Sequence, residues 1–444
     1  MKTIIMAGGR GTRIQSVASD IPKPMIPICG IPILEREIEC LRTQGFTDII
    51  LTVSHQWEVI ADYFGDGSKI SPVTGKPFGV AIRYYVESTP LGNAGALFKL
   101  REQLTDDFLL LNADAMFDVD FNRFLAFHRA CGGEATLFTH PNSHPYDSGV
   151  IVADDNHCVT GWLAKEDMRP QWYQNRVNAG LHVLSPNALD RAGIDPDQVG
   201  RIVDGKTVKV DLDRQVLKPL CGTGRMFCYD SPEYVKDMGT PDRFEEVCQD
   251  VKSGRARARN LMRPQKAVFL DRDGTLNRYV GFLRKAEEME LLPGVSEAVR
   301  RINRSGYLAI VVTNQPIIAR GEVTAAGLRE IHNKLETLLG HEGAYLDAIY
   351  YCPHHPHSGY EGEVKELKID CDCRKPKPGL LRKAAADFNI DLSQSWMIGD
   401  RESDILAGKA AGCRTALIGA DDHGQNLTSS SLLEAVEEIM KVEE

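Results

Sequence analysis

The chain has 444 residues, longer than the ~250 to 300 residues at which one hydrophobic core stops growing, so we expect two domains. Its 43% hydrophobic and 26% charged residues are typical of a soluble globular protein, and no apolar run approaches the ~18 residues of a membrane span. The net charge of −10 argues against nucleic acid as a partner, because binding a phosphate backbone requires a clustered basic surface.

The N-terminal residues and the cysteines indicate in which cellular compartment the protein resides. The apolar stretch at the start of the chain ends at Gly8 and Gly9, short of the ~7 to 15 apolar residues of a secretory signal. The eleven cysteines lie mostly singly in apolar surroundings, where a reduced thiol is the usual state. We therefore expect a cytoplasmic protein without membrane contact, and this composition is compatible with an oligomer.

Short apolar runs alternate with helix-periodic stretches from the start of the chain to residue 251. The spacing of Ile33, Leu34 and Ile38 predicts one amphipathic helix. The expected strands lie near residues 3–6, 49–53, 108–111 and 181–184. This alternation predicts an α/β domain over residues 1–251.

A basic segment with almost no large apolar residues follows at residues 252–264, and we expect it to be a linker, because it carries too few charges for a nucleic-acid patch. The strand and helix alternation then restarts. The expected strands lie near residues 268–270, 308–312, 348–351, 396–398 and 416–418. The sequence thus predicts a second doubly wound α/β domain over residues 265–444, with sites beyond the carboxyl ends of the strands.

A glycine-rich loop follows the first expected strand. Its glycines let backbone amides approach phosphate oxygens, and its arginines add charge that does not titrate. The loop residues concerned are Ala7, Gly8, Gly9, Gly11, Thr12 and Arg13. Lys23 comes next, held between Pro22 and Pro24, whose fixed φ angles stiffen its presentation.

Further polar positions stand at turns and strand ends of the first half. In chain order they are Gly92 in a small-residue turn, Asn112 and Asp114 after an apolar strand, Asn178 and Gly180, and Asp237. Together with the glycine-rich loop, this order resembles the sugar-1-phosphate nucleotidyltransferase family, in its mannose or heptose 1-phosphate guanylyltransferase branch. The resemblance spans nearly the whole first half.

The resemblance implies a Rossmann-like mixed sheet and a set of roles. The loop from Gly8 to Arg13 would hold the triphosphate, with Ala7, Lys23, Gly92, Asn112 and Asp114 completing the nucleotide site. Asp114 and Asp237 would hold Mg²⁺, while Arg13 and Lys23 would stabilise the transition state by charge, without a covalent intermediate. Lys165, Asn178 and Gly180 would meet the sugar phosphate. Where the family commonly has Glu-Lys-Pro, this chain has Ala164 before Lys165, and Ala164 cannot contact sugar hydroxyls.

In the second half, the apolar run at residues 268–270 ends in two carboxylates, Asp271 and Asp273. This pattern resembles the haloacid dehalogenase superfamily of phosphohydrolases. The resemblance implies that Asp271 attacks phosphorus and that Asp273 gives a proton to the leaving oxygen and then activates water. The domain leaves little room for the large cap of many relatives.

The later motifs stand in the order of that superfamily. The resemblance implies that Thr313 and Asn314 bond the phosphoryl group and that Lys375 balances its charge. Asp400 would join Asp271 and the Asp273 carbonyl around Mg²⁺, and Arg374 would read the sugar end or its remote phosphate. Asp404 is expected outside the metal shell, as a helix cap or an outer partner.

Three thiols and an imidazole lie within residues 352–373, at Cys352, His354, Cys371 and Cys373. A Cys₃His set suits a closed, structural Zn²⁺ site. The alternatives are a disulfide, or His355 or His357 in place of His354. Such a loop resembles two subgroups, the heptose 1,7-bisphosphate 7-phosphatases and the histidinol phosphatases, and residues 313–321 and 359–362 favour the heptose enzymes.

Both resemblances together imply a bifunctional enzyme. It would hydrolyse the 7-phosphate of D-glycero-D-manno-heptose 1,7-bisphosphate through an aspartyl-phosphate. It would then transfer guanylyl from GTP to heptose 1-phosphate, giving GDP-heptose and pyrophosphate. GTP is implied because the His-x-Gly-His signature of the ADP-heptose transferases is absent. One alternative is a mannose or other hexose 1-phosphate nucleotidyltransferase fused to a histidinol-phosphatase-like enzyme. Another is that one domain is a non-catalytic sugar-nucleotide sensor.

Overall fold

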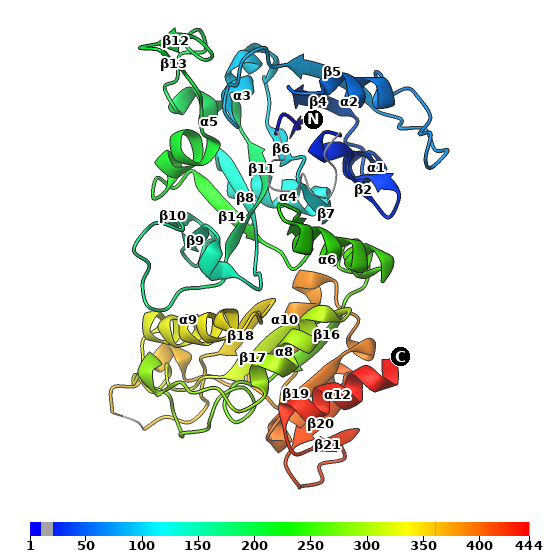
Figure 1. The fold of residues 1–444 in the computed structure, drawn as a ribbon. Helices are drawn as coiled ribbons and strands as arrows, with labels where there is room; N and C mark the ends of the chain where they lie inside the picture. The colour runs from blue at the N-terminus through cyan, green and yellow to red at the C-terminus, as the bar shows by residue number, and fades with distance from the viewer. Residues whose placement is uncertain (10–20, 360, 444) are drawn as a thin grey trace. The chain divides into compact units, whose positions relative to one another are not determined.

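A computed structural model describes residues 1–444 except 10–20, 360 and 444. The chain forms two compact units (Figure 1). The first comprises Met1–His140, Ile151–Leu163 and Asn178–Asn260, and the second comprises Pro141–Val150, Ala164–Val177 and Leu261–Glu444. None of the helices in the described residues is long and apolar enough to cross a membrane.

The first unit is built on a nine-stranded mixed sheet with the order β10-β9-β11-β6-β1-β4-β5, to which β8 and β14 attach beside β11. Strands β6, β1, β4 and β5 run parallel, whereas β11 is antiparallel to β6. The bounds are β1 (Lys2–Met6), β4 (Asp48–Val53), β5 (Ala81–Val86), β6 (Phe108–Asn112), β8 (Ala135–His140), β9 (Val150–Ala153), β10 (Val159–Leu163), β11 (Val177–Leu184) and β14 (Met226–Asp230). The mixed Rossmann-like sheet expected from the sequence is confirmed.

Helices cover both faces of this sheet because successive strand residues point to opposite sides. Ile5, for example, packs in the core beneath α1, α2 and α4, whereas Ile4 packs in the core beneath α3 and α5. The bounds are α1 (Ile33–Thr43), α2 (Trp57–Phe64), α3 (Gly95–Lys99), α4 (Phe121–Cys131), α5 (Pro186–Arg191), α6 (Pro241–Lys252) and α7 (Arg255–Ala258). Small pieces that matter for the site are η2 (Lys23–Met25) and the antiparallel pair β7 (Ala115–Asp118) and β15 (Tyr234–Asp237).

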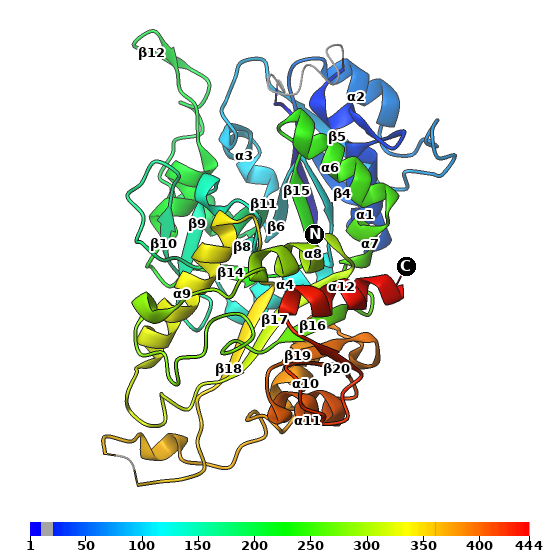
Figure 2. The same cartoon turned by 60° about the horizontal axis from the view of Figure 1, so that its bottom comes forward.

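The second unit contains a parallel six-stranded sheet with the order β18-β17-β16-β19-β20-β21. Helices α8, α9 and α12 cover one face, and α10 and α11 cover the other (Figure 2). The bounds are β16 (Lys266–Leu270), β17 (Tyr307–Asn314), β18 (Ala348–Cys352), β19 (Trp396–Gly399), β20 (Arg414–Ile418), β21 (Leu427–Ser429), α8 (Val295–Arg304), α9 (Ala325–His341), α10 (Gly379–Phe388), α11 (Glu402–Ala411) and α12 (Leu432–Glu443). The doubly wound architecture is again the expected one.

The compact units differ in two places from the expected division at residues 251 and 264. Two strips of the first half, residues 141–150 and 164–177, group with the second unit. In the second strip, the Tyr173 N–H donates to the Thr337 hydroxyl of α9 at 3.0 Å, and the Thr337 hydroxyl donates back to the Tyr173 carbonyl at 3.0 Å. The expected linker also carries helix α7, and Ala256 and Leu261 in it are buried, so much of this segment is packed structure.

Candidate active sites

The glycine-rich loop begins where β1 ends at the carboxyl edge of the first sheet. The Ala7 N–H bonds the Thr52 carbonyl at 2.8 Å, and the Ser54 hydroxyl donates to the Gly8 carbonyl at 2.7 Å. A Cβ added at Gly9 would meet no atom of the described residues within 4 Å. The loop therefore leaves β1 along its neighbour β4. Gly11, Thr12 and Arg13 of the expected loop lie outside the described residues.

Lys23 lies at the start of η2, where Pro22 and Pro24 on either side hold its backbone. Its side chain is only 8% exposed, and its Nζ lies 3.0 Å from Asp114 Oδ2. Two residues 91 positions apart are thus brought into an ion pair at the edge of the sheet. The expected nucleotide-site members Lys23 and Asp114 are together.

Asp114 and Asp237 lie side by side because β7 and β15 pair. Asp237 is opposite Ala115 in the antiparallel register, and the Met238 N–H donates to the Asp114 carbonyl at 3.3 Å. Asp237 forms its own ion pair with Arg243 at 2.6 Å. Both carboxylates remain about half exposed, at 46% and 43%, so each can turn from its basic partner toward a hard cation.

The expected sugar-phosphate residues of β11 lie beside the end of β6. Gly180 has φ +76°, a backbone conformation that favours glycine, and a Cβ there would stand 2.5 Å from Asn112 Nδ2. The Gly180 N–H donates to Asn178 Oδ1 at 3.2 Å, and Asn178 Oδ1 also lies 3.1 Å from His182 Nε2. Asn112, Asn178 and Gly180 thus form one group.

Two further expected transferase residues, Gly92 and Lys165, have contacts outside these groups. Gly92 has φ +85°, and a Cβ there would lie 2.2 Å from the Val210 carbonyl oxygen, so close backbone approach explains this glycine. Lys165 falls in the second compact unit, where its ammonium pairs with Asp147. Lys165 is thereby the one described member of the expected transferase set that lies outside the first unit.

Asp271 directly follows β16 and is 7% exposed. The Lys375 ammonium lies 2.8 Å from Asp271 Oδ1 and 2.6 Å from Asp404 Oδ1, and Lys375 and Asp404 are almost wholly buried. Burial opposes the charge of Lys375, but the two carboxylates outweigh it and raise its pKa. Asp404 was expected as a helix cap or an outer partner, and it has both contacts, because it pairs with Lys375 and its Oδ2 accepts from the Arg401 N–H at 3.1 Å.

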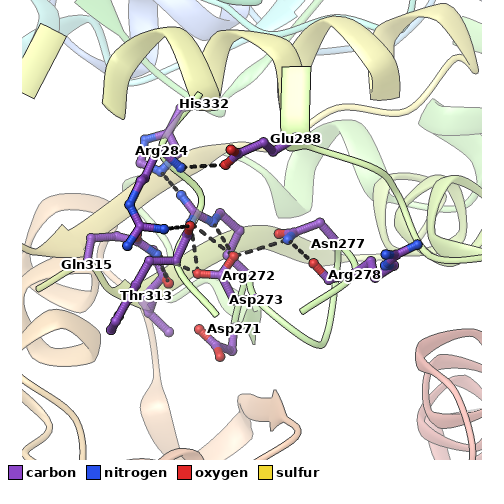
Figure 3. Close-up of polar contacts among 12 residues, drawn as sticks. Asp271, Arg272, Asp273, Asn277, Arg278, Arg284, Glu288, Thr313, Gln315 and His332 are labelled. Carbon is purple, nitrogen blue, oxygen red and sulfur yellow. Dashed lines mark hydrogen bonds and ion pairs between the residues drawn. The ribbon is translucent and has the colours of Figure 1, made fainter. Parts of the chain in front are cut away.

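Asp273 is held by a network of donors (Figure 3). Arg272 binds its carboxylate with two nitrogens, the nearest contact being 2.8 Å, and Gln315 and Asn277 donate at 2.8 and 3.1 Å. Burial would raise the pKa of Asp273, but the charge and hydrogen bonds of Arg272, aided by Gln315 and Asn277, outweigh it and lower the pKa. The resting group is therefore a carboxylate, and the Asp271 side chain lies apart from this network.

Arg272 is itself fully buried and is braced from α9. Its Nη1 lies 3.1 Å from His332 Nε2. Burial and the Arg272 charge lower the pKa of His332 to about 3, so the imidazole is neutral and accepts from the guanidinium. Neither residue was identified from the motif pattern. The signal was an arginine between two aspartates at the end of an apolar strand, because a buried arginine requires paired acceptors.

The residues at the carboxyl end of β17 and directly after it support Asp273 and Lys375. Thr313 is buried, and its hydroxyl accepts from the Gln315 amide at 3.0 Å. The Asn314 amide donates to the Lys375 carbonyl and accepts from the Lys375 N–H, both at 3.0 Å. Asn314 thus positions the lysine backbone. Gln315, quoted in the motif but not expected in the site, holds Asp273.

Asp400 completes a group of carboxylates with Asp271 and Asp404, whose oxygens lie within 4.8 Å of one another. Gly274 has φ +92°, and a Cβ there would stand 2.2 Å from Asp400 Oδ2, so the glycine makes room for this carboxylate. Asp400 Oδ1 is buried and has no hydrogen-bond partner among the described residues, and burial together with the Asp271 charge raises the pKa of Asp400. An unpaired buried oxygen beside a second carboxylate fits a hard divalent cation.

Cys352, His354, Cys371 and Cys373 converge at one point of the second unit. The Cys373 sulfur lies 3.1 and 3.2 Å from the sulfurs of Cys371 and Cys352, and 3.2 Å from His354 Nδ1. These separations exceed the ~2.05 Å of a disulfide and suit four ligands around one tetrahedral ion. His354, rather than His355 or His357, lies with the thiols, and Arg374 donates to the His354 carbonyl at 3.3 Å.

Two family models match different parts of the chain. Residues 2–254 match the family model described as nucleotidyl transferase, and residues 372–435 match the HAD-hydrolase-like model. The chain is 41% identical over 155 residues to the D-glycero-beta-D-manno-heptose-1,7-bisphosphate 7-phosphatase of Haemophilus ducreyi, covering 35% of this chain and 82% of that protein. It is 41% identical over 152 residues to the corresponding phosphatase of Escherichia coli strain K12, covering 34% and 78%.

Two crystal structures are also similar. The D,D-heptose 1,7-bisphosphate phosphatase from B. bronchiseptica, complexed with magnesium and phosphate, is 30% identical with a TM-score of 0.35, covering 40% of this chain and 99% of that chain. HddC from Yersinia pseudotuberculosis is 24% identical with a TM-score of 0.45, covering 56% and 99%.

The two folds and their sites define a nucleotidyltransferase joined to a HAD-type phosphatase in one bifunctional enzyme. The chain belongs to the nucleotidyl transferase family over residues 2–254, and its C-terminal part belongs to the family of D-glycero-beta-D-manno-heptose-1,7-bisphosphate 7-phosphatases.

Proposed function

We propose that the chain performs two consecutive steps in the activation of a heptose. The C-terminal site removes the 7-phosphate of D-glycero-D-manno-heptose 1,7-bisphosphate. The N-terminal site then transfers guanylyl from GTP to the resulting heptose 1-phosphate, giving GDP-heptose and pyrophosphate. The observation that carries this proposal is the fusion itself, because a relative of heptose bisphosphate phosphatases is joined to a nucleotidyltransferase. The product of the first reaction belongs to the substrate class of the second.

In the phosphatase step, Asp271 attacks the phosphorus while the bond to the sugar oxygen breaks, giving an aspartyl-phosphate. The Lys375 ammonium, 2.8 Å from Asp271, balances the charge of the phosphoryl oxygens. Asp273 gives a proton to the leaving oxygen and then takes one from the attacking water. The lowered pKa leaves the resting Asp273 unprotonated, so it takes up a proton from solvent as the substrate binds and returns to that protonated form when it takes the proton of the attacking water.

In the transferase step, the chain acts by position and charge. The backbone at Gly8 and Gly9 approaches the triphosphate, and Lys23 neutralises charge on the phosphate oxygens. Asn178 and Gly180 meet the sugar phosphate. The sugar phosphate oxygen attacks the α-phosphorus directly, so this site forms no covalent enzyme intermediate.

The acidic groups fit Mg²⁺ in both sites. Asp271 and Asp400, with the Asp273 carbonyl, would hold it in the phosphatase, and the unpaired Asp400 Oδ1 supports this assignment. Asp114 and Asp237 would hold it in the transferase. When bound, the cation neutralises the charge that develops on phosphate oxygens.

The cluster of Cys352, His354, Cys371 and Cys373 suits a structural Zn²⁺, because four protein ligands leave no open position for chemistry. The eleven free cysteines suit a reducing compartment, and we propose the cytoplasm.

A coupled assay tests the proposal. The whole chain receives the α or the β anomer of heptose 1,7-bisphosphate with GTP, ATP, CTP or UTP in turn, and phosphate and pyrophosphate are measured separately. We expect phosphate release followed by pyrophosphate release with GTP only. Phosphate without pyrophosphate would leave the acceptor of the transferase unassigned, and the absence of both products would refute the heptose assignment.

A further inference from the structure

Glu37 is an acidic residue that is fully buried on the core-facing side of helix α1. It lies on the face of α1 that also carries Leu34, Ile38 and Leu41, and it is 0% exposed. Neither of its carboxyl oxygens has a hydrogen-bond partner in the described part of the chain. Glu35 on the same helix is almost equally buried, at 4%, but it accepts from the Tyr63 hydroxyl at 2.6 Å and the Thr74 hydroxyl at 2.9 Å.

The surroundings of Glu37 connect it to the transferase site. Helix α1 packs against η2, which carries Lys23, and against β7, which follows Asp114. Burial raises the pKa of Glu37 well above its usual range, the Asp114 charge raises it further, and the Lys23 charge lowers it. The two charges that act on this buried carboxyl are therefore the ion pair at the edge of the nucleotide site.

An unpaired buried carboxyl is costly, and replacing such a group by an apolar side chain of similar size commonly stabilises a protein. The Lys23 ammonium, whose charge acts on Glu37, has three N–H donors, and among the described residues it bonds Asp114. Asp114 is 46% exposed and can turn toward a cation, whereas Lys23 is 8% exposed and confined. Once Asp114 turns, the ammonium needs another acceptor.

We propose that Glu37 is a positioning residue that accepts the Lys23 ammonium when Asp114 turns to the divalent cation. Glu37 then holds Lys23 from the helix side and leaves its other N–H groups for the phosphate oxygens of the nucleotide. This inference rests on the proposed function of the first site, in which Asp114 is a ligand of Mg²⁺ and Lys23 meets the triphosphate.

The test compares the unaltered full chain with Glu37→Met, Glu37→Gln and the matched control Glu35→Met. Calorimetry without ligands gives the Tm, and titration of GTP with and without Mg²⁺ gives the Kd. Sugar 1-phosphate transfer gives kcat and KM, and phosphate release by the same sample checks the second site. Glu37→Gln is a mild substitution that keeps an acceptor oxygen, so the comparison does not depend on Glu37→Met folding.

We expect Glu37→Met to raise Tm and yet to reduce the gain in GTP affinity that Mg²⁺ gives by about tenfold to a hundredfold, with kcat reduced similarly. Glu37→Gln should lie between Glu37→Met and the unaltered chain. Glu35→Met should lower Tm, since two hydroxyl donors lose their acceptor, and leave the Mg²⁺ effect and kcat unchanged. If Glu37 has only a structural role, its substitution should change Tm and leave the Mg²⁺ effect on GTP affinity and kcat unchanged.

The outcomes separate this inference from the function on which it rests. If the unaltered chain shows neither Mg²⁺-enhanced GTP binding nor transfer, the proposed function of the first site fails and takes the role of Glu37 with it. If the unaltered chain shows both and the two Glu37 variants keep them, only the role of Glu37 is overturned.

Discussion

The two sites of this chain differ in how their charges are held. In the phosphatase, the Asp271, Lys375 and Asp404 side chains are at most 10% exposed and directly paired. In the transferase, Asp114 and Asp237 are about half exposed, and each is held by a basic side chain from another segment. The phosphatase site is assembled before any ligand arrives, whereas the transferase site must exchange its ion pairs for ligand contacts.

The difference follows from the chemistry. A covalent nucleophile acts only if its oxygen is fixed toward the phosphorus, so burial and a buried lysine serve Asp271. A site that binds a triphosphate, a cation and a sugar phosphate needs carboxylates that can move.

The largest expected effect is the loss of the nucleophile. Asp271→Asn should lower phosphate release by roughly 10⁴-fold or more, because no other group can form the aspartyl-phosphate. Asp114→Asn should lower transfer by about 10²- to 10³-fold, since Asp237 and Lys23 remain. Steady-state assays of both activities on each variant check this. Each variant should leave the other activity nearly unchanged, and a parallel loss of both activities would show that the sites are not independent.

Removing the lysine of each site should lower the free energy of unfolding more for the phosphatase site than for the transferase site. Lys375→Met leaves two carboxylates facing each other in a buried place, and we expect a loss of about 3 to 5 kcal/mol in the free energy of unfolding. Lys23→Met should cost about 1 kcal/mol or less, because Asp114 is half exposed and water can solvate it. Urea unfolding measures both. Lys377→Met, which breaks only an exposed pair with Asp370, is the control, and equal losses at Lys375 and Lys23 would contradict the contrast.

Zinc should stabilise one unit only. We expect a chelator, or Cys371→Ser, to remove bound zinc and destabilise the second unit. The loss should be about 2.7 kcal/mol where free zinc had been 100-fold above its Kd. Metal analysis with calorimetry checks this, and Cys413→Ser, a buried thiol outside the cluster, should retain the zinc. Full zinc loss with no change in the unfolding of the second unit would refute a structural role.

Sequence alone could predict some features of the two sites and not others. The strands and the groups at their carboxyl ends, such as Asp114 after β6 and Asp271 after β16, follow from local pattern and from family motifs. Tertiary packing alone brings His332 of α9 to Arg272 and the strip around Tyr173 to Thr337. Glu37 had a local signal, a glutamate within an apolar helical stripe, but its neighbours Lys23 and Asp114 come from other elements.

The smallest expected effect concerns pH and the buried His182 of β11. Burial lowers the pKa of His182 to about 3, whereas an unfolded histidine has a pKa near ~6.5. Between these values the unfolded chain binds a proton that the folded chain does not, so stability rises with pH through this range. The contribution is fully present above about pH 6.5, and at pH 5 about 2 kcal/mol of it is lost.

His182→Gln should therefore flatten the acid slope of stability in the first unit, because the group that titrates only in the unfolded state is gone. Calorimetry from pH 4.5 to 7.5 measures this slope, and the transition that GTP shifts identifies the first unit. His182 Nε2 lies 3.1 Å from Asn178, so the variant should also raise the KM for the sugar phosphate, whereas the phosphatase should keep its KM. An unchanged slope would mean that His182 titrates alike in both states, and its burial would then not exclude the proton.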